Sequence, residues 1–312
     1  MKNLIIYSTE ESAYFAELIG KELGVKPSKI EREEFPDGEL YHRLEIADKS
    51  ELFGQTVIFV SSTQSDKTFD ELEKIGHGLA EMGVKRRIFV IPFFGYSTME
   101  RAVLPGEMVS AKINARRLSN IPNSDQGNVF LLLDLHVSGI LHYFEGDCLR
   151  YELSAAELLR QAISDLKLKD FVFGTADLGR VKLTEKLATH FKTSIVFIRK
   201  SRDFMEVKAE EVIGDVKGKN VIIYDDMIRS GGTLLKAAAA YKKQGAAKVY
   251  AVLSHLALTD EKAAAKLEKS VLEKVITTNS HPRSQNKLIK RSKKIIVKDV
   301  APEFVKIIKK LL

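Results

Sequence analysis

The sequence predicts an α/β protein with two domains, each built on a mainly parallel β-sheet flanked by helices. Short apolar runs rich in β-branched residues alternate with helical segments along the whole chain. The runs are continuously apolar, which is typical of parallel strands that are buried on both faces. The length of 312 residues corresponds to about two domains of roughly 150 residues each. These observations indicate a series of strand–helix–strand units with right-handed crossovers.

The first half is expected to form strands at its apolar runs, which are Leu4–Tyr7, Thr56–Val60, Arg87–Pro92 and Val129–Leu133. Helices are expected to begin at Ser8–Ser12 and to lie near Phe69–Met82 and Gly106–Leu118. The segment Glu34–Glu39 contains proline and glycine between two strand-like arms, so it is expected to be a turn.

The second half is expected to repeat this scheme. Its strands are expected at Phe171–Phe173, Thr193–Ile198, Val221–Tyr224, Val249–Ser254, Lys274–Thr278 and Lys294–Val297. Its helices are expected near Glu152–Leu166, Val181–His190, Thr233–Gln244 and Pro302–Leu312. The apolar pattern lapses at Glu145–Asp147, and the expected domains are therefore residues 1–147 and 148–312.

Composition narrows the class of protein. A hydrophobic fraction of 45% with 29% charged residues is typical of a globular protein and too apolar for a disordered one. The single cysteine, Cys148, excludes an internal disulfide framework and a cysteine-rich metal cluster. No apolar run approaches the roughly 18 residues that span a bilayer, and the N-terminus lacks the pattern of a signal peptide. We therefore expect a cytoplasmic protein that does not act in a membrane.

The charge balance points to anionic partners. The chain has 49 Lys and Arg against 42 Asp and Glu, a formal net charge of +7, which is compatible with nucleic acid or with phosphate-rich small molecules. The basic residues are interleaved with acids, and an aromatic–basic recognition motif is missing from the sequence. We therefore expect small molecules rather than nucleic acid as partners.

The strongest chemical signal is the segment Val221–Thr233, which reads VIIYDDMIRSGGT. A buried strand is expected to carry Asp225 and Asp226 at its carboxyl end, where parallel sheets bind ligands. Glycines let a ligand approach the backbone closely, and the free N–H groups at the start of a helix bind phosphate. The carboxylates can accept hydrogen bonds from ribose hydroxyls or hold Mg²⁺ through water.

Two simpler interpretations of this segment are less well supported. It could be an acidic turn before an ordinary helix capped by Ser230 or Thr233. However, paired carboxylates at a strand end seldom coincide with a Gly-Gly-Thr turn. A Walker phosphate loop is not supported, because Gly-Lys-Ser/Thr does not follow the glycines.

This segment resembles the phosphoribosyl-diphosphate binding loop of type I phosphoribosyltransferases. Its lead-in, Ile213–Lys219, is similar to that of ribose-phosphate pyrophosphokinases, also called phosphoribosyl pyrophosphate synthetases. Further elements of that family are matched by Phe35–Glu39, Pro92–Tyr96, Ser110–Lys112, Leu133–His136 and Asp177. The resemblance covers nearly the whole chain and implies two phosphoribosyltransferase-like domains.

The resemblance implies Mg²⁺-dependent transfer of the pyrophosphoryl group of ATP to the 1-hydroxyl of ribose 5-phosphate. The products would be 5-phosphoribosyl 1-pyrophosphate and AMP. Catalysis of this kind depends on positioning and on cations rather than on covalent chemistry. The family's nucleotide site is completed by a neighbouring subunit, which implies a homodimer or a homohexamer.

The resemblance also implies roles for individual residues. ATP would lie between the two halves, near Phe35, Asp37, Glu39 and Arg101, and Mg²⁺ would be held at His136 and Asp177. Ribose 5-phosphate would be bound by Asp225, Asp226, Arg229, Ser230, Gly231, Gly232 and Thr233. The remaining histidines lack such a context and are expected to be surface or packing residues; they are His42, His77, His142, His190, His255 and His281.

The segment Arg199–Glu211 is dense in charge of both signs and, taken alone, is typical of a solvated surface loop. Its Lys200 and Arg202 match the Lys-x-Arg that opens the family's catalytic loop. The resemblance therefore implies that this loop closes over the triphosphate, excludes water and neutralises developing charge.

Several positions depart from the family pattern. Thr98 and Met99 stand where an Arg and a Gln usually contact ATP, and Arg229 stands where these enzymes usually have Asp. An extra guanidinium near the 5-phosphate could favour a larger acceptor, such as ADP-ribose.

Two further functions are compatible with the pattern, namely a non-catalytic regulatory subunit and a phosphoribosyltransferase. The presence of Lys200, Arg202, His136 and Asp177 argues against a regulatory subunit. The N-terminal half and the lead-in Ile213–Lys219 argue against a phosphoribosyltransferase.

Overall fold

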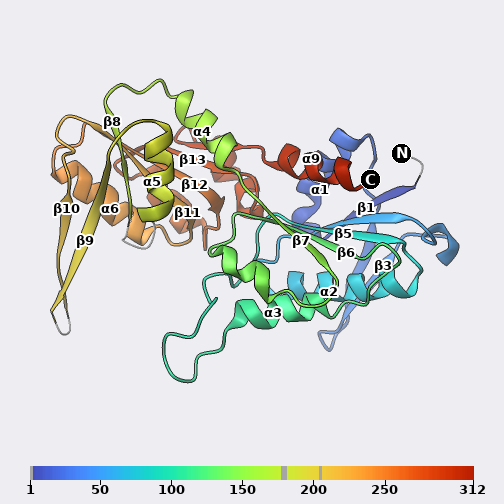
Figure 1. Ribbon diagram of the computed structural model, residues 1–312. Coiled ribbons are helices and arrows are strands. Elements are labelled where there is room, and N and C mark those ends of the chain that lie inside the picture. Colours follow the sequence, from blue (N-terminus) through green and yellow to red (C-terminus); the bar gives the residue numbers. More distant parts are fainter. Residues whose placement is uncertain (1–2, 177–180, 204–205) are drawn as a thin grey trace. The chain divides into compact units, whose positions relative to one another are not determined.

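The computed structural model describes residues 3–176, 181–203 and 206–312, and the chain divides into two compact units (Figure 1). Unit 1 comprises Met1–Ser154 and Val300–Leu312, and unit 2 comprises Ala155–Asp299. Each unit contains a largely parallel sheet flanked by helices, as the sequence predicts. The units differ from the expected domains, 1–147 and 148–312, because a strand at Leu149–Leu153 and the last helix belong to unit 1.

The sheet of unit 1 has the order β1-β4-β5-β6-β7, and every neighbouring pair is parallel. Its strands are β1 (Leu4–Ser8), β4 (Thr56–Val60), β5 (Arg86–Ile91), β6 (Asn128–Leu133) and β7 (Leu149–Leu153). The three central strands are almost fully buried, which explains their continuously apolar sequences. Between β1 and β4, the strands β2 (Ile30–Glu34) and β3 (Leu40–Leu44) form a separate antiparallel hairpin.

Helices cover both faces of this sheet (Figure 1). They are α1 (Ala13–Leu23), α2 (Asp66–Glu81), α3 (Ser110–Ser119) and α9 (Ala301–Leu311). The helices α2 and α3 share a hydrophobic core with Phe59 and Phe89. On the other face, the rings of Phe15 in α1 and Phe304 in α9 meet edge to face at 5.5 Å. This contact explains why the end of the chain packs with unit 1.

The sheet of unit 2 has the order β10-β9-β8-β11-β12-β13-β14. Its pairs are parallel except for β9 with β10, which are antiparallel. The strands are β8 (Phe171–Gly174), β9 (Ile195–Asp203), β10 (Glu206–Ile213), β11 (Asn220–Ile228), β12 (Lys248–Leu256), β13 (Leu272–Thr278) and β14 (Ile295–Lys298).

The helices of unit 2 are α4 (Ala156–Ser164), α5 (Val181–His190), α6 (Gly232–Lys243), α7 (Glu261–Glu268) and α8 (Lys287–Arg291). The helices α6 and α7 share a hydrophobic core with Val221 and Ile223 of β11. The helix α5 packs against β8 and β9, and α4 packs against β12, β13 and β14. None of the helices described in either unit is long and apolar enough to cross a membrane.

The strand order of unit 2 reverses between β8 and β11. From β8 the chain adds β9 and β10 on one side, and it then crosses to β11 and adds β12, β13 and β14 on the other side. The described strands of unit 1 instead follow one another in a single direction. Open parallel sheets bind ligands at the carboxyl ends of the strands where the order reverses. This topology therefore places the preferred ligand position of unit 2 beside the carboxyl end of β11.

Two expected elements are wrong. Glu152 and Leu153 end the edge strand β7 and do not begin a helix, which starts only at Ala156. This strand lies at the edge of the sheet and therefore contains polar as well as apolar residues. Because it lacks a continuous apolar run, the sequence pattern does not identify it as a strand. Residues 199–203 and 206–211 belong to the antiparallel strands β9 and β10 rather than to a loop. Residues Ile195–Ile198 form the apolar base of the β9–β10 hairpin. Antiparallel backbone pairing continues beyond them into the charged residues.

A buried histidine lies just beyond β13. His281 is 6% exposed, and its Nδ1 accepts a hydrogen bond of 3.1 Å from the backbone N–H of Arg283. Burial, followed by the charges of His255 and Arg283, lowers the pKa of His281 to about 3. The folded protein therefore holds this imidazole in its neutral form at pH 7.

This burial predicts a pH-dependent stability. Because the folded pKa lies below the unfolded value of about 6.5, the contribution of His281 is present above pH 6.5 and is lost as the pH falls towards 3. In this window the group should lower the free energy of unfolding by up to about 1.4 kcal/mol per pH unit. His281→Asn, which keeps an acceptor for Arg283, should remove this component in urea titrations, whereas the exposed His190→Asn should not. An unchanged pH slope in His281→Asn would contradict the prediction.

Candidate active site

The start of α6 is built by a glycine in a left-handed conformation. Gly231 precedes the helix with φ 79° and ψ −7°, a region that residues with a side chain rarely adopt. Its carbonyl accepts the hydrogen bond of Leu235 N–H at 2.9 Å. The earlier amides of the first turn have no carbonyl partner within the helix, and the residues Gly232 and Thr233 are exposed. Together with the helix dipole, such amides form a binding site for phosphate.

The two aspartates lie inside β11, because this strand extends to Ile228 and not only to the expected end at Tyr224. The register with β12 is regular, with Asp225 opposite Leu253 and Met227 opposite His255. Successive strand residues point to opposite faces, and Asp226 is accordingly buried while Asp225 is half-buried. The two carboxylates therefore face different sides of the sheet and are not a side-by-side pair.

Polar side chains at the carboxyl ends of β12 and β13 were missed by sequence reasoning. The carbonyl of Ser254 accepts hydrogen bonds from the hydroxyls of Thr278 at 2.7 Å and Ser280 at 3.3 Å. The hydroxyl of Ser280 also lies 2.8 Å from Nδ1 of His255. All these residues are buried. The run of polar residues Thr277–Ser280, which follows Val275 and Ile276 at the end of β13, is the sequence signal that could have revealed this network.

A second chain of contacts joins this region to the predicted phosphate loop. Arg283 Nη2 donates to the carbonyl of Thr259 at 3.2 Å, and the Thr259 N–H donates to the carbonyl of Arg229 at 3.4 Å. The backbone of the Arg229 loop is therefore supported from the segment that follows β13. The side chains of Arg229 and Ser230 are exposed.

The predicted catalytic cations lie on β9. In the antiparallel pairing, Lys200 is opposite Glu210 and Arg202 is opposite Val207. Asp177 lies outside the described residues, although β8 ends at Gly174, shortly before it. The roles of these three residues therefore stay predictions.

In unit 1, the segment after β6 carries the predicted metal residue His136. Asp134 has φ 37°, which is unusual for a residue with a side chain, and its N–H donates to the carbonyl of Leu153 at 3.0 Å. Leu135 N–H donates to Oε1 of Glu152 at 3.0 Å. The end of β7 therefore holds the turn that presents His136, which is half-buried.

Glu152 was also not predicted as a site residue, because its segment was expected to be helical. The pKa of its carboxyl group is raised, mainly because the group is buried. Hydrogen bonds with Ser138 and Leu135 act in the opposite direction, and the charge of Asp134 raises the pKa further. Two carboxylates thus lie close enough to interact beside His136. Carboxylate oxygens are the ligands that Mg²⁺ prefers, so this edge of unit 1 suits a divalent cation. Within the described residues, however, no three His, Cys, Asp or Glu side chains converge as a metal site.

The segment after β5 holds the predicted ATP residue Arg101. Gly95 packs so tightly that a Cβ there would lie 1.9 Å from the carbonyl oxygen of Thr63. Tyr96 follows with φ 59°, and its hydroxyl lies 2.5 Å from Oδ1 of Asp66. Farther on, the side chain of Arg101 is 77% exposed and lies 3.5 Å from the carboxylate of Glu100.

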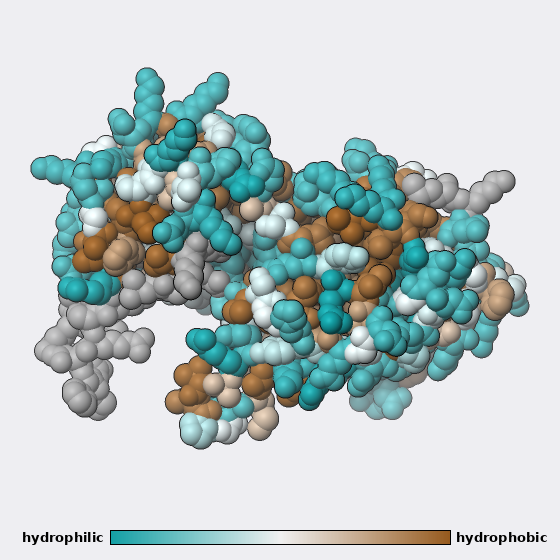
Figure 2. Space-filling model, in the orientation of Figure 1, coloured by the Kyte–Doolittle hydropathy of each residue, from teal (hydrophilic) through white to brown (hydrophobic). Residues whose placement is uncertain are grey.

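The rest of the segment between β5 and α3 exposes apolar side chains, namely Met99, Val103, Leu104 and Met108. Figure 2 shows apolar surface on the lower part of the molecule, over the loop that precedes α3 in Figure 1. Met99, one of the two residues expected to depart from the family pattern, is therefore part of a wider apolar character in this segment.

The turn Phe35–Glu39 lies at the tip of the β2–β3 hairpin, as predicted. Gly38 has φ 90°, and its N–H donates to the carbonyl of Phe35 at 2.8 Å. The side chains of Phe35, Asp37 and Glu39 are exposed, and the ring of Phe35 packs against that of Tyr41 with centroids 6.0 Å apart. The turn thus exposes an aromatic ring and two carboxylates at the surface.

These features define an α/β protein with an exposed helix start after β11 in unit 2 and a carboxylate-rich strand edge in unit 1. Comparison with known proteins gives the family. Residues 4–121 match the N-terminal domain of ribose phosphate pyrophosphokinase, and residues 196–311 match the phosphoribosyl synthetase-associated domain. The chain belongs to the ribose-phosphate pyrophosphokinase family.

Individual relatives are similar over nearly the whole chain. A ribose-phosphate pyrophosphokinase of Methanopyrus kandleri is 31% identical over 91% of this chain and 95% of its own length. Ribose-phosphate pyrophosphokinase 1 of Listeria monocytogenes is 30% identical over 94% of this chain and 90% of its own. The crystal structure of phosphoribosylpyrophosphate synthetase from Mycobacterium smegmatis has a TM-score of 0.87 and 27% identity, and the match covers 99% of each chain.

These matches confirm the predicted family, the assignment as an enzyme and the fold of two phosphoribosyltransferase-like domains. They do not test individual side chains, so the site residues stay predictions.

The conformation of Gly231 gives a test of the phosphate loop. Gly231→Ala should lower the free energy of unfolding by about 1–2 kcal/mol, the usual cost of a left-handed conformation for an L-residue. It should also weaken the binding of ribose 5-phosphate, because the first amides of α6 would shift. Urea denaturation and calorimetric titration measure the two effects.

Gly24→Ala is the matched control. Gly24 follows α1 in unit 1 with φ 68°, and a Cβ there would meet nothing within 4 Å. It should lower the free energy of unfolding to a similar degree but leave ribose 5-phosphate binding unchanged, and equal effects of the two substitutions on binding would show that the turn at Gly231 has no special role.

Proposed function

We propose that the protein transfers the pyrophosphoryl group of ATP to the 1-hydroxyl of ribose 5-phosphate, forming 5-phosphoribosyl 1-pyrophosphate and AMP. The observation that carries this proposal is the start of α6, which follows β11 at the reversal of strand order in unit 2. Membership of the family supplies the reaction class.

The acceptor sugar binds in unit 2 in this proposal. The amides of the first turn of α6 bind the 5-phosphate, and the exposed side chains of Arg229, Ser230 and Thr233 lie around them. Asp225 and Asp226, on the strand that leads to this loop, accept hydrogen bonds from the ribose hydroxyls.

The nucleotide binds to residues of unit 1. The exposed Phe35 ring offers a face for the base, Asp37 and Glu39 accept hydrogen bonds, and the exposed Arg101 pairs with phosphate. The acceptor oxygen then attacks the β-phosphorus while the bond to the AMP oxygen breaks, so negative charge develops on the transferred group and on AMP.

Cations stabilise this charge in the proposal. Lys200 and Arg202 neutralise the transferred group and help to exclude water. Mg²⁺, held by His136 and Asp177, would supply further neutralisation of the phosphate oxygens. The carboxylates of Asp134 and Glu152 beside His136 support a cation at this edge of unit 1.

A larger acceptor is the second candidate. Arg229 is exposed in the phosphate loop and could pair with an additional phosphate, as in ADP-ribose. A cytoplasmic location and a homodimer or homohexamer, in which a neighbouring subunit completes the nucleotide site, are also part of the proposal.

The reaction can be tested by one incubation with Mg²⁺ and ATP, with ribose 5-phosphate and ADP-ribose as separate acceptors. We expect AMP release that depends on ribose 5-phosphate, measured by chromatography of the nucleotides. AMP release only with ADP-ribose would assign the larger acceptor, and ADP release would indicate an ordinary kinase. Absence of any release would favour a regulatory subunit.

The role of the β9 cations can be tested by Lys200→Ala. Loss of one preorganised charge stabiliser should lower kcat by on the order of 10²–10³-fold. Lys243→Ala, at the exposed C-terminal end of α6, should leave kcat unchanged. Unchanged turnover in Lys200→Ala would refute the role assigned to this residue.

A further inference from the structure

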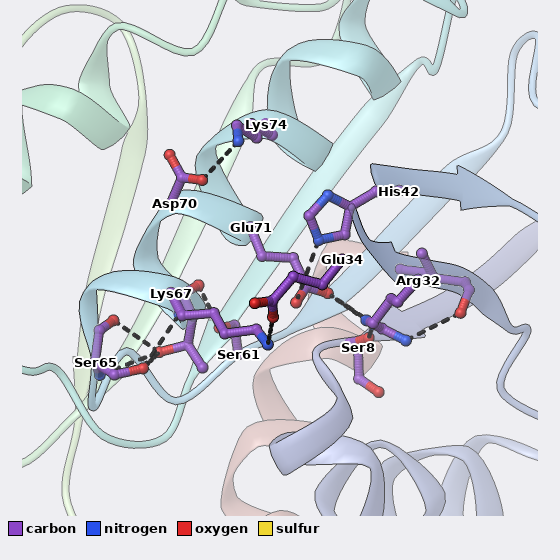
Figure 3. A network of polar contacts seen from close by, with 12 residues as sticks. Ser8, Arg32, Glu34, His42, Ser61, Ser65, Lys67, Asp70, Glu71 and Lys74 are labelled. Atoms are coloured by element: carbon purple, nitrogen blue, oxygen red, sulfur yellow. Dashed lines mark hydrogen bonds and ion pairs between the residues drawn. The ribbon is translucent and has the colours of Figure 1, made fainter. Parts of the chain in front are cut away.

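A buried charge cluster joins the β2–β3 hairpin to α2 (Figure 3). Arg32 of β2 donates to Oε1 of Glu71 in α2 through Nε at 3.0 Å and through Nη2 at 2.7 Å. On the other side of the carboxylate, Nε2 of His42 in β3 lies 3.8 Å from Oε2. The side chain of Glu71 is only 3% exposed. We call Arg32, His42 and Glu71 the hairpin latch.

The geometry of the latch follows from the register of the hairpin. Arg32 and His42 are direct cross-strand partners, so their side chains lie on the same face, and both point to Glu71 in Figure 3. The carboxylate of Glu71 thus receives one side chain from each strand. A shift of either strand by one residue would turn its partner to the opposite face. The latch therefore determines both the position and the register of the hairpin.

Arg32 also connects the hairpin to β1. Its Nη2 donates to the carbonyl of Ser8 at 2.6 Å, and its Nη1 donates to the carbonyl of Ile30 at 3.0 Å. The guanidinium thus links the end of β1, the first residue of β2 and the side chain of Glu71. A carboxylate at this depth is unfavourable without such a partner.

Other contacts hold the hairpin less firmly near its tip. It forms a sheet of its own and does not pair with the five-stranded sheet of unit 1. Ile30 and Leu44, its buried residues, lie at the base away from the turn. A pocket of about 510 Å³ lies between β3 and α2, lined by Leu40, His42, Ile75, Leu79 and Met82. Near the tip, Lys67 and Glu34 are exposed and 3.9 Å apart, a type of pair that contributes little.

We infer that Arg32, His42 and Glu71 are positioning residues for nucleotide binding, because they hold the turn Phe35–Glu39 in place. The latch lies two residues before the last pair of the hairpin, Glu34 with Leu40, which is roughly 7 Å along the strands. A shift of Arg32 or His42 would therefore also shift the turn Phe35–Glu39. This inference rests on the proposed function, in which the turn contacts ATP.

The test compares Glu71→Gln with Glu31→Gln. Glu71→Gln removes the negative charge of the latch and leaves the guanidinium of Arg32 without its carboxylate partner. Glu31→Gln removes the exposed ion pair with Arg43, an interaction between the two strands of the same hairpin. For Glu71→Gln we expect KM for ATP to rise about tenfold, while KM for ribose 5-phosphate and kcat stay within about twofold. Glu31→Gln should leave all three constants unchanged.

Hydrogen exchange supplies an independent measurement. The amides of Phe35 and Gly38 donate within the turn at 2.9 and 2.8 Å. In Glu71→Gln they should exchange about tenfold faster, while the amides of β4 keep their rates. If Glu71→Gln does not fold, the double variant Arg32→Gln/Glu71→Gln is used, since it leaves no unpaired buried charge.

The outcomes distinguish a failure of the hairpin latch from a failure of the proposed function. Equal KM values for ATP and equal exchange in the two single variants would overturn the latch, as would a rise of both KM values together with faster exchange throughout unit 1. If the wild-type protein does not release AMP, the proposed function fails. The exchange comparison would then still decide whether the latch positions the turn.

Discussion

The reversal of strand order between β8 and β11 is the constraint on which unit 2 depends. Parallel strands all end at the same edge, and the chain must leave β8 and β11 towards opposite sides. The loop that leaves β11 therefore becomes exposed beside β8, where Gly231 turns it sharply into α6. The buried hydroxyls of Thr278 and Ser280 donate hydrogen bonds to the carbonyl of Ser254 and so stabilise this edge of the sheet. Topology, glycine conformation and a buried polar network thus combine at the position where we propose that phosphate binds.

Unit 1 shows that strained backbone gathers at the same kind of edge. Asp134 after β6 and Tyr96 after β5 have positive φ values, and neither residue is a glycine. Each is held by a specific hydrogen bond, Asp134 N–H with Leu153 and the Tyr96 hydroxyl with Asp66. Such conformations persist only when the surrounding structure enforces them, and they concentrate at functional sites. In unit 2, Gly231 has a positive φ at the carboxyl edge, whereas the non-glycine residues with positive φ, Lys167, Asp170 and Lys192, precede β8 and β9.

The sequence predicted the features that depend on local pattern. Continuous apolar runs identified β4 and β6 because these strands are buried on both faces, and the VIIYDDMIRSGGT segment identified the start of α6. Features that depend on distant partners could not be predicted. The edge strand β7 lacks an apolar run, and α9 joins unit 1 through the contact of Phe304 with Phe15. Likewise, Glu71 and Arg32 are 39 residues apart, and only the folded chain reveals that they meet.

Binding of the phosphorylated acceptor at the start of α6 can be observed in a crystal structure of the protein with ribose 5-phosphate. The phosphate oxygens should lie about 3 Å from backbone amides within Ser230–Leu234, a normal hydrogen-bond distance. Ribose 5-phosphate bound only to unit 1, or bound to unit 2 without contact to these amides, would contradict it.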